Sequence, residues 1–175
     1  MTTKEELAAY FNEHVLYELL QLRYARKRLG TKTTKILWNA MFAAFNVSAR
    51  NLYDFLNNKG GANEYNVKDF IPHELKLTSK SNLTGTVQLL GRQVFHFGKL
   101  RTDKPDRKIN LKNVGLLEDW IETNISHCLD AMEEDLRSQI QPERAELPPA
   151  IVVTDHAVSS FPTTISYTAR PRSGD

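Results

Sequence analysis

The feature that most constrains the fold is a row of apolar side chains that recurs every three or four residues late in the sequence. This spacing places them on one face of a helix, and it excludes the strict alternation of a half-buried strand. The row predicts one long amphipathic helix over about residues 113–140, which Pro142 would end. Its members are Leu117, Ile121, Ile125, Cys128, Met132, Leu136 and Ile140.

Three earlier segments have the same periodicity, over about residues 4–29, 34–57 and 83–100. Thr3 and Glu6 have the spacing of a capping box at the start of the first segment. The second segment is the richest in apolar residues, so we expect it to be central. Its predicted buried stripe consists of Leu37, Met41, Ala44, Leu52, Phe55 and Leu56. The stripes of the second and fourth helices should form most of the core.

The expected fold is therefore all-α, an antiparallel bundle of four long helices. Residues 1–141 would form the helical bundle domain. The composition changes after that, because five of the seven prolines lie in residues 142–175. We predict a flexible, mostly irregular, Pro-rich tail for this segment, with a short β-hairpin or strap as an option.

The ends of the chain and its single cysteine bear on its location. Cys128 is the only cysteine, so no intrachain disulfide can form. The N-terminal residues do not have the pattern of a signal peptide, and no apolar run is long enough to span a membrane. These features predict a cytoplasmic protein that does not contact a membrane.

The formal net charge of +2 excludes a highly basic nucleic-acid packaging protein, but it conceals an uneven distribution. Residues 1–112 contain 19 basic and 10 acidic residues, whereas residues 113–146 contain 2 basic and 9 acidic residues. A molecule with separate basic and acidic faces could self-associate or offer a cationic face to RNA. The first basic cluster consists of Arg23, Arg26, Lys27, Arg28, Lys32 and Lys35.

Motifs for cofactors and metals are missing from the sequence. It contains no glycine-rich phosphate loop and no HExxH pair, and its five histidines are widely scattered. We therefore expect no cofactor and no metal site.

Two polar groups within the predicted helices are candidate site residues. Arg50, Asn51 and Asp54 interrupt the most apolar helix, where Arg50 and Asp54 are four residues apart and can pair. Arg92 and His96 have the same spacing in the third helix. A histidine can transfer a proton near neutral pH, and an arginine can bind phosphate. The alternatives are a paired surface arginine and a core or capping histidine.

These two places resemble an uncharacterised branch of bacterial HEPN-type helical-bundle proteins, over about residues 5–138. The resemblance is carried by Arg50, Asn51, Asp54 and Phe55, and then by Gln93, His96 and Arg101. It implies an all-α and often dimeric protein. Many members of this group are metal-independent ribonucleases of toxin–antitoxin or phage-defence systems, with a catalytic arginine followed after four to six residues by a histidine.

The present chain departs from that catalytic signature. Three residues separate Arg92 from His96, and no histidine follows Arg50 at the required spacing. The sequence therefore favours a non-catalytic interaction module with a second copy or a small protein as partner. The alternative is a metal-independent ribonuclease or RNA-binding protein, for which Arg50, Asn51, Arg92 and His96 are the hypothetical catalytic residues.

Overall fold

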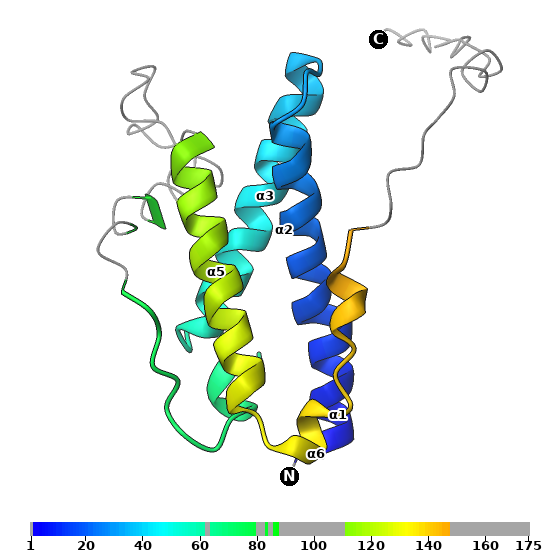
Figure 1. Ribbon diagram of the computed structural model, residues 1–175, viewed down its shortest axis with the longest axis vertical. Helices are drawn as coiled ribbons and strands as arrows, with labels where there is room; N and C mark the ends of the chain where they lie inside the picture. The colour runs from blue at the N-terminus through cyan, green and yellow to red at the C-terminus, as the bar shows by residue number, and fades with distance from the viewer. Residues whose placement is uncertain (1, 62–63, 80–82, 84–85, 88–110, 148–175) are drawn as a thin grey trace, which may run out of the picture.

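The computed structural model describes residues 2–61, 64–79, 83, 86–87 and 111–147, and this part of the chain is helical and contains no strand. Three long helical rods run through it (Figure 1). The first combines α1 (Lys4–Tyr10), a π-helical turn η1 (Phe11–Val15) and α2 (Leu16–Leu29). The others are α3 (Lys35–Leu56) and α5 (Leu111–Ala131). The all-α prediction is confirmed for these residues.

The first rod begins at a capping box and contains one π-helical turn. The Thr3 hydroxyl accepts a hydrogen bond from the Glu6 backbone, and the Glu6 carboxylate accepts one from the Thr3 backbone, so the predicted capping box is present. Within η1 the Leu16 N–H donates to the Phe11 carbonyl, five residues earlier. Such π-helical turns are rare and frequently occur at functional sites.

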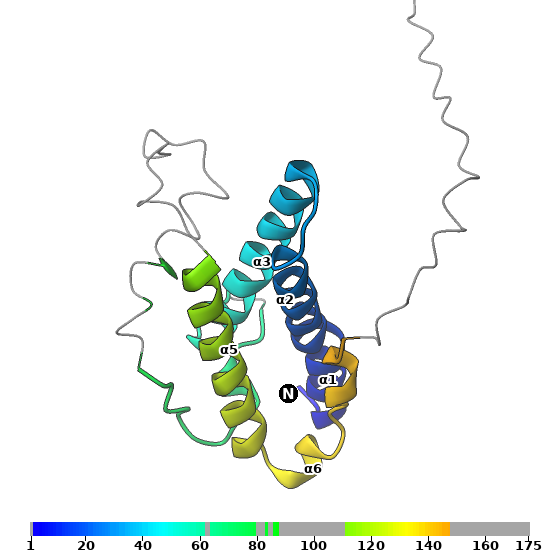
Figure 2. The ribbon, with the colours of Figure 1, turned by 45° about the horizontal axis from the view of Figure 1, so that its top comes forward.

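The three rods do not all alternate in direction. α2 runs antiparallel to α3, and α5 runs in the same direction as α3 (Figures 1 and 2). The helix predicted over residues 83–100 lies mostly outside the described residues, although Val87 N–H donates to the Leu83 carbonyl as in a helix. A four-helix antiparallel bundle therefore remains a prediction.

The core lies between the rods and contains most of the faces predicted for the first, second and fourth helices, although Met41 and Ala44 of the second are only partly buried. From the first rod, Phe11 and Leu22 are fully buried, and from the last, Leu117 and Ile121. Leu37 is an exception to the predicted stripe of α3, because its side chain is 45% exposed. That prediction is wrong, since periodicity identifies a face of a helix but not the length over which a neighbour covers it.

The predicted fourth helix is shorter than its apolar row. α5 ends at Ala131, Glu133 has extended backbone angles, and a short helix α6 (Glu134–Arg137) follows. The residues after α6 bind the first rod through the Asn12 side chain. It donates to the Gln139 carbonyl at 3.0 Å and accepts from Gln141 N–H at 2.8 Å. Met132, Leu136 and Ile140 stay buried because the chain turns around the core.

Two further segments are held against the rods. The short 3₁₀ turn η4 (Pro142–Ala145) lies on α2, with Ala145 buried and its carbonyl accepting from Arg23. The predicted division at residue 141 remains a prediction, because residues 148–175 lie outside the described part. The connector, which is the chain after α3 as far as residue 79, contains the 3₁₀ turn η2 (Val67–Asp69), and its Thr78 bonds to Trp120 and Asn124 of α5. None of the described helices has the length and apolar composition that a membrane span requires.

Candidate functional site

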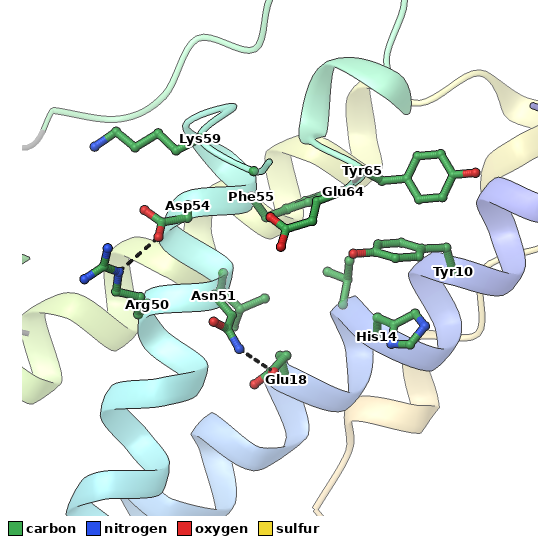
Figure 3. Close-up of a pocket in the computed structure, with 13 residues that line it drawn as sticks. Tyr10, His14, Glu18, Arg50, Asn51, Asp54, Phe55, Lys59, Glu64 and Tyr65 are labelled. Atoms are coloured by element: carbon green, nitrogen blue, oxygen red, sulfur yellow. Dashed lines mark hydrogen bonds and ion pairs between the residues drawn. The ribbon is translucent and has the colours of Figure 1, made fainter. Parts of the chain in front are cut away.

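A cavity with a volume of about 600 Å³ lies between the first rod, the end of α3 and the loop after it. Tyr10, His14 and Glu18 reach it from the first rod (Figure 3). Arg50, Asn51, Asp54 and Phe55 reach it from α3. Lys59, Gly60, Glu64 and Tyr65 complete the rim from the loop.

The π-helical turn explains how the first rod contributes three side chains to one wall. Tyr10, His14 and Glu18 are spaced four residues apart. In a regular α-helix of 3.6 residues per turn, that spacing drifts steadily around the helix axis. The wider turn at Phe11–Val15 compensates for part of this drift and keeps all three beside α3.

The two predicted site residues of α3 are both held by neighbouring carboxylates. Arg50 Nε lies 3.0 Å from Asp54 Oδ2, the four-residue pair that their spacing predicts. Asn51 Nδ2 donates to Glu18 Oε1 at 2.7 Å and so ties α3 to α2 across the cavity. Arg50 is therefore already partly neutralised.

The cationic and anionic side chains of the cavity point in different directions. Arg50 and Lys59 extend away from the space between α3 and the first rod (Figure 3). Lys59 Nζ lies 5.1 Å from the centre of the Tyr53 ring, within the range of a cation–π contact. The carboxylates of Glu18 and Glu64 and the hydroxyl of Tyr10 point into that space (Figure 3). The interior of the cavity is therefore anionic.

Aromatic rings close the end of the cavity nearest α1. The ring centres of Tyr10 and Tyr65 are 4.7 Å apart in an edge-to-face arrangement, and those of Tyr10 and His14 are 4.6 Å apart. The pKa of Tyr10 is raised, mainly by partial burial and further by Glu64, Tyr65 and Glu18. The carboxylates thus oppose the appearance of a further negative charge at this hydroxyl.

The carboxylates of Glu18 and Glu64 can each accept further hydrogen bonds from a ligand. Glu64 Oε2 accepts from Gly61 N–H at 2.8 Å, and Glu18 accepts from Asn51. An ionised carboxylate can accept about four hydrogen bonds. Among the described residues no group of three His, Cys, Asp or Glu side chains is arranged to hold a metal ion.

The other predicted site residues cannot be compared with this geometry. Arg92 and His96, together with Gln93 and Arg101 of the resemblance, lie outside the described residues. A histidine outside the predicted set, His14, lines the same cavity as Arg50 and Asn51.

The sequence reasoning did not identify Tyr10, His14, Glu18, Glu64 and Tyr65 as cavity residues. The four-residue spacing of the first three was an available signal, because it predicts a shared helix face. No local signal could place the loop residues Glu64 and Tyr65 opposite that face.

Comparison with family models, with curated proteins and with solved structures found no match to this chain. We therefore classify the protein by its fold and its cavity. It is a helical protein with an anionic, tyrosine-lined cavity between two helices.

Proposed function

We propose that the protein is a non-catalytic interaction module whose cavity binds a basic side chain of a protein partner. The observation that supports this proposal is the orientation of charges in the cavity. Glu18, Glu64 and the Tyr10 hydroxyl converge on its interior, while Arg50 and Lys59 point away from it (Figure 3). An ammonium or guanidinium group forms strong charge-assisted hydrogen bonds to carboxylates.

The aromatic rings suit the same kind of ligand. A lysine or arginine has an apolar stem that packs on tyrosine rings, and its charge is attracted to their faces. The ring of Tyr10 lies beside the carboxylates and offers such a surface (Figure 3). A phosphate group would instead meet the carboxylates of Glu18 and Glu64, so the anionic interior of the cavity argues against RNA as its ligand.

The likeness to HEPN-type proteins and a cytoplasmic location belong to this proposal. The all-helical fold and the position of Arg50 late in α3 support the likeness. A non-catalytic role agrees with the departure from the Arg–His signature and with the pairing of Arg50 with Asp54.

A titration of the full chain with a trilysine peptide, followed by NMR, tests the proposal. We expect shifts at Tyr10, Tyr65 and the Asn51 side-chain amide, and none with triglutamate. Glu18→Gln combined with Glu64→Gln should weaken binding about tenfold or more, since each charge-assisted hydrogen bond contributes roughly 1.5–3 kcal/mol. Glu134→Gln on α6 removes an exposed carboxylate that does not line the cavity and is the matched control. Equal binding by the double variant and the control would refute the proposal.

The ribonuclease alternative has its own test. RNA cleavage in EDTA that is lost in both Arg50→Ala and His96→Ala would establish metal-independent catalysis and replace the present proposal. Binding of inorganic phosphate that Arg50→Ala abolishes would also count against a cavity for basic groups.

A further inference from the structure

The hairpin of α2 and α3 ends in a protruding tip. α2 ends at Leu29 and α3 begins at Lys35. In both views of the described part, the turn between them extends beyond the first residue of α5 (Figures 1 and 2). Residues 27–38, from the end of α2 to the first turn of α3, are called the hairpin tip below.

The charge of the hairpin tip has a single sign. The sequence contains no aspartate or glutamate between Glu18 and Asp54. The tip has four exposed basic side chains, Lys27, Arg28, Lys32 and Lys35. Across the residues that the structure describes, none of these four forms an ion pair. The guanidinium of Arg28 instead lies 5.2 Å from the centre of the Tyr24 ring. The tip is therefore a cluster of uncompensated positive charge.

The charges of α5 do not change this sign. Glu118 and Glu122 pair with Arg26 and Arg23, which precede the tip on α2. The first charged residue of α5 is another exposed cation, Lys112.

The charges at the far end of α3 are remote from the tip. The helix separates Lys35 from Asp54 by about 28 Å along its axis. Asp54 pairs with Arg50 there, and the carboxylates of the cavity lie at the same end. They are too distant to neutralise the tip, because charges more than a Debye length apart are largely screened.

Large apolar side chains lie beside these cations. Ile36 is 84% exposed and Leu37 is 45% exposed, directly after Lys35. Trp38 follows, partly buried, with its ring stacked on that of Phe42 at 5.1 Å. Exposed aliphatic residues with a tryptophan and a ring of lysine and arginine are typical of segments that bind at a bilayer surface.

We propose that the hairpin tip docks on an anionic lipid bilayer. Ile36 and Leu37 enter the boundary between headgroups and acyl chains, and the four cations contact the headgroups. The tip projects from the described part, so it can reach the bilayer first, and the cavity at the other end of α3 stays in water. The sequence expectation of no membrane contact considered leader peptides and membrane spans, and docking at the surface requires neither.

The apolar residues favour a bilayer over a nucleic acid. The phosphates of RNA would attract the same four cations, but they offer no apolar environment to Ile36, the most exposed of the large apolar residues. A bilayer with anionic lipids supplies both parts at once, with negative charge at its surface and hydrocarbon just below it.

Co-sedimentation of the full chain with lipid vesicles tests the proposal. We expect binding to vesicles made of equal parts of phosphatidylserine and phosphatidylcholine, and little binding to phosphatidylcholine alone. Binding should weaken as sodium chloride is raised from about 0.1 to 0.5 M, because salt screens the attraction to the headgroups. Equal binding to both kinds of vesicle would overturn the proposal.

The contribution of the cations has a matched pair of variants. Lys32→Gln combined with Lys35→Gln should weaken binding about twentyfold, since each cation near an anionic surface contributes about fivefold. Lys68→Gln combined with Lys76→Gln makes the same change of charge at two exposed residues of the connector. This control should bind nearly as well as the natural chain. An equal loss in both double variants would show that only the net charge matters.

The contribution of the apolar residues is tested on the same helix. Ile36→Ser should weaken vesicle binding about tenfold or more, because it removes the side chain that enters the bilayer. Val47→Ser, at a position 37% exposed and farther along α3, is the control and should bind as the natural chain does. The fluorescence of Trp38 should shift to shorter wavelength on vesicles, whereas Trp120, 5% exposed, is already buried. Unchanged binding by Ile36→Ser would overturn the insertion of the tip.

Other occupants of the tip give different results. Binding of polyuridylate without binding of vesicles, lost in the Lys32 and Lys35 double variant but not in Ile36→Ser, would show a nucleic-acid surface and overturn the proposal. Self-association without vesicles that Ile36→Ser abolishes would show that a second copy covers the tip, and would also overturn it. The cavity proposal is tested separately by trilysine, so either proposal can fail while the other stands.

Discussion

Asn124 on α5 holds the backbone and the side chain of Thr78 at the same time. Its Oδ1 accepts from Thr78 N–H at 2.9 Å, and its Nδ2 donates to Thr78 Oγ1 at 2.8 Å and to the Trp120 carbonyl at 2.6 Å. Asn124 is fully buried. This amide, together with Trp120 Nε1, which donates to the Thr78 carbonyl, attaches Thr78 to α5.

Removal of this amide should be costly. We expect Asn124→Ala to lower the free energy of unfolding by about 1–3 kcal/mol, because it leaves buried polar groups without partners. Chemical denaturation measures the change. Thr123→Ala, at an exposed neighbouring position, is the control and should change stability by less than about 0.5 kcal/mol. Equal effects of the two substitutions would show that the contact does not hold the connector.

The stripe of α5 and the first turns of α3 should respond differently to truncation. Leu117→Ala and Ile125→Ala should each cost about 2–5 kcal/mol, since both side chains are buried and would leave cavities. Leu37→Ala should cost less than about 1 kcal/mol in the monomer, because its side chain is 45% exposed. Thermal unfolding at low protein concentration tests the contrast. A larger loss for Leu37→Ala than for Ile125→Ala would contradict this assignment of the core.

The cavity predicts a pH effect at Tyr10. Burial and nearby negative charges raise the pKa of Tyr10 above its ordinary value of 10.0. The resulting stabilisation is present below the unfolded pKa, and it is lost as the pH rises through the folded pKa. NMR of ring-labelled tyrosine should show that Glu64→Gln lowers the pKa of Tyr10. Glu134→Gln should leave it unchanged, and an equal pKa in all three proteins would exclude the proposed influence of Glu64.

Arg23 connects three segments and should couple to Glu122. Its Nε and Nη2 each lie 2.6 Å from a Glu122 oxygen, and its Nη1 donates to the Ala145 carbonyl at 2.8 Å. A double-mutant cycle should give a coupling of about 1 kcal/mol for this half-buried bidentate pair. The cycle for the more exposed Lys4 and Glu133 should give a smaller coupling. A reversed order would mean that burial and bidentate geometry do not determine these couplings.

Cys128 should be chemically inert in the folded protein. Burial raises the pKa of its thiol to about 12, so very little thiolate forms at pH 8. We expect iodoacetamide to modify Cys128 only through unfolding, and rapidly in denaturant. Ile125→Ala should accelerate the reaction by destabilising the fold. Fast labelling of the natural protein without denaturant would be inconsistent with a buried thiol.

In the structure, part of the charge asymmetry of the sequence is neutralised by ion pairs within the chain. The sequence predicted separate basic and acidic faces, yet Arg23 pairs with Glu122, and Arg26 Nε lies 3.2 Å from Glu118. Part of the basic front thus binds the acidic helix within one chain.

The sequence by itself determined the three long rods of the described residues and most of their buried faces. The capping box at Thr3 and the apolar row from Leu117 to Ile140 are local patterns, and helix formation and face polarity depend on local residues. Even the Arg50–Asp54 pair followed from its spacing. Contacts of this kind require no knowledge of what lies across the core.

Only the tertiary structure decided where α5 ends and what surrounds Arg50. After the break at Ala131 the chain returns to Asn12, more than a hundred residues earlier, which bonds Gln139 and Gln141. The cavity depends on a π-helical turn that brings Tyr10, His14 and Glu18 beside Asn51 and on a loop that adds Glu64. These contacts join residues far apart in sequence, so their geometry is set by packing and could not be read from local periodicity.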